Sequence, residues 1–248
     1  MPTHRVLLHQ NGPALWPEHK PLAEVLELKE TTPELIWHGT YQGSPTPPGG
    51  YTFKRAWWPR KHRYALGQQH IHARFLSFDT GLKDKETADF TACTVGELWP
   101  DYRLGLAYAE QARYEFPFLP EYIEQTAVRW NYDGRLNAVI IEDKASGISA
   151  LQTLQASSPA WLADMLVAFN PTTDKVTRAS QAAVWCKNHS VLLPVLQPDL
   201  HWLIDFEDEL FDFPQAVHDH RTDAFSQMIL YLENLLSAGW QARGGDNQ

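Results

Sequence analysis

The segment LNAVIIED, residues 136–143, constrains the fold more than any other part of this sequence. It is a near-continuous apolar run bounded by Gly134 and Gly147, and it ends in two acidic residues. A strand of this kind must be buried on both faces, because either face would otherwise expose apolar side chains to water. The sequence therefore predicts an α/β protein in which helices flank a central sheet.

Other segments predict that this sheet is mixed. The strand-like runs at 71–79 and 90–98 are separated by a polar stretch, so we expect them to pair as a hairpin. A short strand is expected at 190–194. The run at 105–116 is ambiguous between strand and helix.

Helical patterns alternate with these strands. They occur at 118–134, 148–155, 174–188, 201–214 and from about His218 to Ser237. The last pattern has an expected buried stripe of Val217, Ala224, Met228, Leu232 and Leu235. Gly239 lies just beyond its end, where glycine commonly terminates a helix.

The chain divides into three expected parts. Residues 1–66 are rich in Pro and Trp and suit neither a helix nor a strand, so they predict an irregular arm. Residues 67–240 are expected to form the single folded domain, and residues 241–248 a loose tail.

Charge and cysteine content restrict function and location. The net charge of -9 argues against a protein that coats DNA passively, because such binding needs Lys and Arg to neutralise phosphates. It does not exclude a nuclease, since carboxylates that hold divalent cations add negative charge. Cys93 and Cys186 have no C-x-x-C partner, and the chain shows neither a leader pattern nor a long apolar run. We therefore expect a cytoplasmic protein without a disulfide framework, a zinc site or a membrane span.

Acidic residues stand where a folded sheet can bring them together. Asp79 ends one predicted strand, Glu142 and Asp143 end the central one, and Asp219 and Asp223 begin the last helix. Two hard cations that act on a phosphodiester need several converging oxygen ligands. The pattern therefore indicates a carboxylate metal site.

Side-chain alternation separates the two acids of the central strand. Successive side chains of a strand point to opposite faces, so only one of Glu142 and Asp143 can face the metals. We favour Glu142 and keep Asp143 as a reserve ligand. On the helix, His220 and Asp223 are three residues apart and share a face, as do Asp219 and Asp223.

Each acid also has a structural interpretation. Asp79 is compatible with a turn or a cap, and Glu142 and Asp143 beside Lys144 are compatible with a solvated turn. The HDHRTD segment at 218–223 is compatible with an ordinary helix N-terminus. The residues alone therefore support a metal site and nothing more specific.

Five short segments, in order, resemble one family. QGSPTPPGGYTFKRAWW resembles the segment that joins the ATPase and nuclease parts of viral large terminases. FLSFDTGLKDKETADFTACTVGEL is similar to the first nuclease strands of that family, and VIIEDKASGISALQTL to its second acidic motif. DKVTRA and FPQAVHDHRTDAFSQMILYL resemble the two later motifs. The match covers roughly residues 37 to 236.

The resemblance implies a ribonuclease-H-like fold and a nuclease that uses two Mg²⁺ or Mn²⁺ ions. It assigns Asp79, Glu142 and Asp223 to metal binding and catalysis, with His220 as an extra ligand or proton carrier, and it leaves Asp143 and Asp219 as further ligands. His220 stands where many members have the second Asp of an H-D-D motif. No G-x-x-x-x-G-K-[ST] phosphate loop is present, so no ATP-driven motor is expected in this chain.

Basic residues near the predicted site have a possible role in binding DNA. Lys83, Lys85, Lys144, Lys175 and Arg178 are candidate phosphate contacts, although solvated Lys and Arg are as common. The Trp residues are interpreted as core or interface residues.

The resemblance thus implies the metal-dependent endonuclease domain of a phage or prophage large terminase, which is expected to cut concatemeric double-stranded DNA in the host cytoplasm. Its expected partners are a separate ATPase part, a small terminase subunit and a portal. One alternative is another ribonuclease-H-like enzyme, such as a resolvase or a transposase. The other is a non-catalytic prophage remnant that acts as a docking module.

Overall fold

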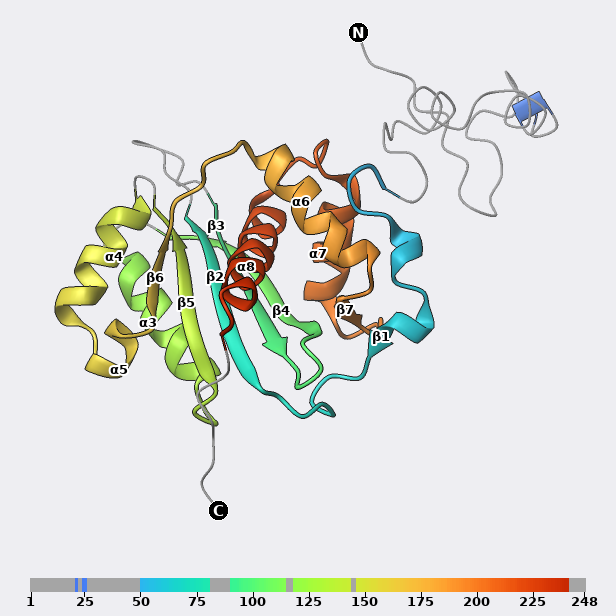
Figure 1. Cartoon of the computed structure of the whole chain (residues 1–248). Coiled ribbons are helices and arrows are strands. Elements are labelled where there is room, and N and C mark those ends of the chain that lie inside the picture. Colours follow the sequence, from blue (N-terminus) through green and yellow to red (C-terminus); the bar gives the residue numbers. More distant parts are fainter. Residues whose placement is uncertain are drawn as a thin grey trace, which may run out of the picture.

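The computed structural model describes residues 50–80, 90–114, 118–143 and 146–240, together with residues 21, 24 and 25. Within them, a seven-stranded sheet has the order β1-β7-β4-β3-β2-β5-β6 (Figure 1). Its strands are β1 (Arg63–Tyr64), β2 (Ala73–Thr80), β3 (Phe90–Leu98), β4 (Leu104–Arg113), β5 (Leu136–Glu142), β6 (Leu166–Phe169) and β7 (Val191–Pro194). Its helices are η2 (Arg55–Trp57), η3 (Arg60–His62), α3 (Phe118–Trp130), α4 (Ser146–Ser157), α5 (Ala160–Ala163), α6 (Lys175–Lys187), α7 (His201–Asp212) and α8 (His220–Ser237).

The sheet is mixed, as the sequence predicts. β3 pairs antiparallel with β2 and β4, whereas the β2–β5, β5–β6, β4–β7 and β1–β7 pairs are parallel. The expected hairpin is the β2–β3 pair, and the central apolar run is β5. The ambiguous run at 105–116 lies mainly in β4, where pairing with β3 and β7 satisfies its backbone groups.

Helices cover both faces of the sheet (Figure 1). On one face, α6, α7 and α8 pack on the sheet around a large apolar cluster, and on the other face α3, α4 and α5 enclose a second cluster. β5 contributes to both: Ala138 and Ile140 lie in the first cluster, and Val139 and Ile141 lie in the second. The alternation explains why this strand reads as a continuous apolar run. The predicted layered architecture is confirmed.

The predicted stripe of the last helix is wrong at one end. Ala224, Met228 and Leu232 are fully buried, but Val217 is 93% exposed. Helical spacing does not extend to Val217, because α8 begins at His220. The apolar run at 160–169 also divides, into the one-turn α5 and then β6, which pairs with β5.

The described part of the N-terminal arm packs against the sheet. Phe53 and Trp58 are buried in the cluster under α7 and α8, and the Trp58 indole donates to the Val191 carbonyl at 2.8 Å. β1 pairs with β7 at the sheet edge. Residues 50–66 therefore belong to the same packed unit as the sheet, whereas most of residues 1–49 and all of 241–248 lie outside the described residues.

Two further observations concern the cysteines and the apolar character of the helices. Cys93 and Cys186 are buried free thiols. Among the described helices, none combines the length and the apolar character needed to cross a membrane.

Candidate metal centre

The packing of α8 on β2 positions the first two acids. Gln227 of α8 donates to the Ser77 hydroxyl at 3.0 Å and to the Phe78 carbonyl at 3.2 Å. Ser77 and Asp79 are two residues apart on β2 and so face the same side of the sheet. Asp223 is one helical turn before Gln227, which places it over the end of β2. Asp79 and Asp223 therefore meet at one end of the sheet.

β5 brings a third acid to the same place. β2 and β5 are parallel, with Phe78 opposite Ile141, so Asp79 and Glu142 are the next residues along each strand. Glu142 follows Ile140 by two positions and faces the side of α8. Asp143 comes after the strand end, where its N–H donates to the Phe169 carbonyl at 2.7 Å. This alternation places Glu142, rather than Asp143, on the side of Asp79.

The last helix adds His220 and Asp219. The Nδ1 atom of His220 lies 3.0 Å from Oδ2 of Asp79, and it donates a hydrogen bond to that carboxylate when Nδ1 carries the proton. Asp219 occupies the N-cap position of α8 but makes no side-chain capping bond. Its carboxylate instead forms an ion pair with Lys175, the first residue of α6. The side chain of Asp219 is therefore directed at the cluster rather than at its own helix.

Arg178 of α6 contacts two of the acids, Asp223 and Glu142. Its Nη2 atom lies 3.4 Å from Oδ1 of Asp223 and 3.8 Å from Oε1 of Glu142. Its Nη1 atom donates to the Thr173 carbonyl at 3.0 Å. α6 begins at this position because Asp174 caps it, accepting bonds from the N–H groups of Val176 and Thr177. One end of α6 thus supplies both Lys175 and Arg178 to the cluster.

The cluster carries more negative charge than its own cations compensate. Burial raises the pKa of Asp79, and the charges of Glu142 and Asp219 raise it further, whereas the hydrogen bond with His220 lowers it. Burial and the charge of Asp79 raise the pKa of Asp223 to about 7, despite the opposing charge of Arg178. A further cation would relieve this repulsion.

These residues fit a hard divalent cation in their chemistry. Asp79, Glu142, Asp219 and Asp223 provide only carboxylate oxygens, the ligands that Mg²⁺ and Mn²⁺ prefer. As the side chains stand, no three His, Cys, Asp or Glu residues within the described ranges are placed to hold one ion. The guanidinium of Arg178 lies between Glu142 and Asp223 instead.

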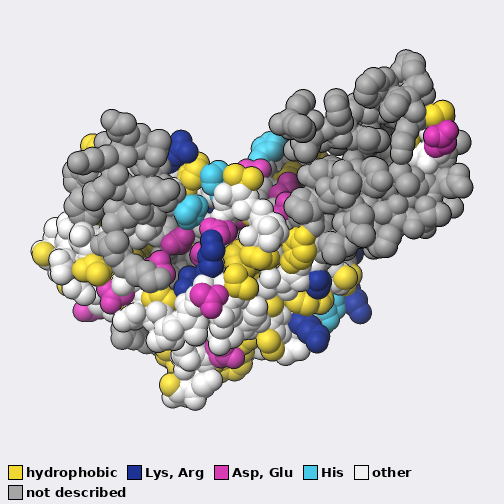
Figure 2. Space-filling view, turned by 90° about the horizontal axis from the view of Figure 1, so that it is seen from above, with side chains coloured by type: hydrophobic (Ala, Val, Ile, Leu, Met, Phe, Trp, Pro, Cys, Tyr) yellow, Lys and Arg dark blue, Asp and Glu magenta, His cyan; other side chains and the backbone are white. Residues whose placement is uncertain are grey.

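The end of the sheet that carries the cluster is visible from above (Figure 2). Acidic side chains gather there with His, Lys and Arg side chains beside them. Of the predicted DNA contacts, Lys175 and Arg178 lie in the cluster, and Lys83, Lys85 and Lys144 lie outside the described residues.

The structure shows three further residues at the edge of the site that the sequence did not predict. They are Phe90, Arg113 and His218, and they are called the rim below. Phe90 packs edge-on against His218, with ring centroids 4.8 Å apart, and the guanidinium of Arg113 lies 4.4 Å from the Phe90 ring centre. The centroid of the His220 ring lies 6.2 Å from that of Phe90. Phe90 and Arg113 are direct partners in the β3–β4 pair, so the hairpin register was the signal that could have found them.

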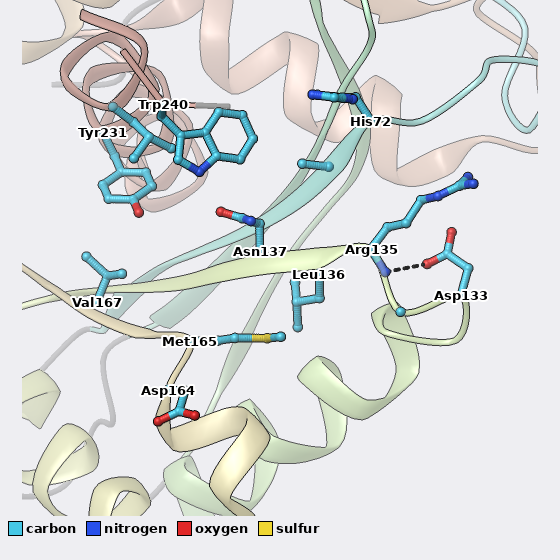
Figure 3. Close-up of a pocket in the computed structure, with 13 residues that line it drawn as sticks. His72, Asp133, Arg135, Leu136, Asn137, Asp164, Met165, Val167, Tyr231 and Trp240 are labelled. Carbon is cyan, nitrogen blue, oxygen red and sulfur yellow. Dashed lines mark hydrogen bonds between the residues drawn. The ribbon is translucent and has the colours of Figure 1, made fainter. Parts of the chain in front are cut away.

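Another cavity, of about 590 Å³, lies at the opposite end of β5 (Figure 3). It is lined by residues near the start of that strand, such as Arg135 and Asn137, and by Trp240 after α8. Figure 3 shows Asn137 on the side of Trp240. No acid of the cluster lines this cavity, so the cavity is separate from the carboxylate site.

Comparisons with known proteins show a shared fold. No model of a known protein family matches the chain, and no curated protein matches it in sequence. The large terminase of a thermophilic bacteriophage matches over 86% of this chain and 54% of its own, at 10% identity and a TM-score of 0.52. The large terminase nuclease of the thermophilic phage G20c with bound magnesium matches over 73% of this chain and 97% of its own, at 12% identity and a TM-score of 0.50.

These matches confirm the predicted ribonuclease-H-like fold. The chain spans about half the length of the first of these two proteins. At such low identities the similarity concerns the fold, and the chemistry has to be argued from the residues of this chain.

Proposed function

We propose that this chain, which has the fold of a phage terminase nuclease, is a metal-dependent endodeoxyribonuclease that cuts concatemeric double-stranded DNA during viral genome packaging. The observation that carries the proposal is the convergence of Asp79, Glu142 and Asp223 from β2, β5 and α8 at one end of the sheet. Buried acids with raised pKa values at one place are typical of a functional site.

Asp79, Glu142 and Asp223 would hold the metal, with Asp219 beside them and Asp143 as a reserve. Two Mg²⁺ or Mn²⁺ ions held there would supply the Lewis-acid chemistry that hydrolysis of a phosphodiester needs. The fold match to a nuclease structure with bound magnesium supports the choice of metal.

The other residues of the cluster position the acids and the DNA. His220 holds the Asp79 carboxylate through Nδ1, and its ring also lies 6.2 Å from that of Phe90. Lys175 and Arg178 are the described candidates for phosphate contacts, and Lys83, Lys85 and Lys144 remain further candidates. Arg113 on the rim is exposed and adds another cation at the edge of the site.

The proposed context rests on the resemblance of the sequence motifs to those of large terminases. We infer that a separate ATPase part, a small terminase subunit and a portal work with this nuclease in the cytoplasm of the host cell.

Plasmid cutting tests the proposal. Wild-type protein should convert supercoiled plasmid to linear DNA in Mn²⁺ and not in EDTA. Asp79→Asn should remove this activity while preserving the circular-dichroism spectrum. Asp208→Asn, which changes an exposed acid of α7 outside the cluster, is the matched control and should cut normally.

Three outcomes would contradict the proposal. Full activity of Asp79→Asn would exclude the carboxylate mechanism. Wild-type protein that shows no thermal shift with Mn²⁺ and no cutting would instead favour a non-catalytic docking module. A strong preference for a four-way junction over plasmid would identify a resolvase.

A further inference from the structure

Arg178 is a buried cation with few strong bonds. Only 8% of its side chain is exposed. Its Nη2 contacts with Asp223 and Glu142 measure 3.4 and 3.8 Å, whereas charge-assisted pairs are commonly about 2.7–2.9 Å. Its Nε atom is buried and has no hydrogen-bond partner among the described residues.

Two other arginines of this protein form ion pairs with shorter distances than those of Arg178. Arg63 reaches Glu207 at 2.6 Å, and Arg74 reaches Asp133 at 2.7 Å. Every guanidinium nitrogen of Arg74 donates at least one hydrogen bond. Arg178 is therefore held near its acids mainly by charge, and its one short hydrogen bond, from Nη1 to the Thr173 carbonyl at 3.0 Å, goes to the backbone.

The surroundings of Arg178 leave space for the guanidinium to move. A cavity of about 530 Å³ lies beside it, between the loop after β6, α6 and α8. Asn170, Thr172, Thr173 and Gln181 line this cavity together with Arg178 and offer polar groups. A change in the Arg178 rotamer therefore does not require the apolar core to repack.

We propose that Arg178 is a resident counter-ion of the carboxylate site, which divalent cations displace and which then becomes available to a phosphate of the DNA. Its Nη2 atom lies 3.8 Å from a carboxylate oxygen of Glu142 and 3.4 Å from one of Asp223, the acids that would hold a metal ion. A metal ion and Arg178 therefore compete for the same carboxylate oxygens. This inference rests on the proposed nuclease function and adds a coupling between metal binding and DNA binding.

Metal affinity is the first readout. Mn²⁺ is titrated calorimetrically into the full chain without DNA, for wild type and for Arg178→Met, which keeps an unbranched apolar stem and removes the charge. Two unit charges about 4 Å apart interact by several kcal/mol in a partly buried site, so Arg178→Met should bind Mn²⁺ at least about tenfold more tightly. Arg178→Lys should stay close to wild type, because it keeps the charge.

The control changes the same charge on the same helix. Lys187→Met replaces an exposed cation at the other end of α6 and should leave Mn²⁺ affinity unchanged. Circular dichroism and thermal unfolding confirm that each variant folds. If Arg178→Met does not fold, Arg178→Gln takes its place with the same expectation.

DNA affinity is the second readout. It is measured with a short DNA duplex, first in EDTA and then in Ca²⁺. Ca²⁺ serves as the metal probe because it also prefers oxygen ligands. Wild type and Arg178→Met should bind equally in EDTA, where Arg178 is engaged with the acids. In Ca²⁺ the variant should bind about threefold to tenfold more weakly, with a smaller salt dependence.

The results separate this inference from the proposed function. Unchanged or weaker Mn²⁺ binding by Arg178→Met, while wild type binds Mn²⁺ and cuts plasmid, would overturn only the counter-ion role. An equal loss of DNA affinity in EDTA and in Ca²⁺ would also overturn it, since that is the behaviour of a fixed phosphate contact. Wild-type protein that binds no Mn²⁺ would overturn both proposals.

Discussion

Two clusters of buried charge lie at opposite ends of β2, and they differ in how well their charges are matched. At the start of the strand, the fully buried Arg74 bonds to Glu97, Asp133, the Tyr132 hydroxyl and the Trp130 carbonyl. At the end of the strand, Asp79 faces other acids, and the nearby cations are held by longer or more exposed contacts.

The pKa directions express the same difference. Burial raises the pKa of Asp133, but hydrogen bonds from Arg74 outweigh it and the net pKa is lowered. Burial likewise raises the pKa of Asp223, and there the charge of Asp79 adds to it, to about 7. Asp133 is therefore neutralised by its own arginine, whereas Asp223, in the proposed metal site, is left short of positive charge.

The largest expected effect is a loss of stability at the Arg74 end of β2, where the arginine is paired with Glu97 and Asp133. Arg74→Met should destabilise the protein by about 3–5 kcal/mol, because it leaves Glu97 and Asp133 without their buried partner. Urea unfolding measures the loss, and Arg135→Met, an exposed change nearby, is the control. A loss below about 1 kcal/mol would show that this cluster is not a structural ion pair.

At the Asp79 end of β2 the expected change in stability has the opposite sign, because removing an acid there stabilises the protein. The folded pKa of Asp223 is about 7, against an ordinary value of 3.8, so ionising this acid costs stability as pH rises from about 4 to about 7. In EDTA at pH 8, Asp223→Asn should therefore stabilise the protein by about 2 kcal/mol, within an upper limit of about 4 kcal/mol. The gain should disappear below about pH 3, where the wild-type acid is protonated in both the folded and the unfolded state.

Thermal unfolding across this pH range measures the effect, with Asp208→Asn as the exposed control. Millimolar Mn²⁺ should reverse the sign, because the wild type then gains stability from a ligand that the variant binds poorly. A variant that is less stable than wild type in EDTA at pH 8 would contradict the comparison.

His220 is expected to have a smaller effect, on activity. A hydrogen bond to a charged group contributes about 1.5–3 kcal/mol, so His220→Ala should reduce plasmid cutting by about tenfold or more by loosening Asp79. His220→Gln keeps a donor and should retain part of the activity. Cutting rates over an Mn²⁺ titration provide the test, and an unchanged rate and metal dependence would remove His220 from the mechanism.

The smallest expected effect is at the rim. Arg113→Gln should weaken DNA binding by about threefold and lower the slope of log affinity against log salt by about 1, the signature of one phosphate contact. Mn²⁺ affinity should not change. Arg135→Gln removes an exposed arginine at the far end of β5 and should leave the salt slope intact. Equal slopes for the two variants would exclude Arg113 from the DNA path.

Local pattern predicted most elements of the fold. The continuous apolar run of β5 and the helical spacing of α3, α6 and α8 follow from burial of one or both faces, which any chain of this composition must achieve. Val217 was misassigned because the stripe was extended past the start of α8. The run that became β4 was ambiguous, since its identity depends on partners that are distant in sequence.

By itself, the sequence determined that acids end two buried strands and begin a helix, because side-chain alternation and helical spacing are local properties. Only the tertiary structure decided that Arg178 lies between Glu142 and Asp223 and that Phe90 brings Arg113 to the rim. Those contacts depend on strand register and on the rotation of α6 and α8 about their axes. Such quantities are set by packing between distant segments, which no local pattern encodes.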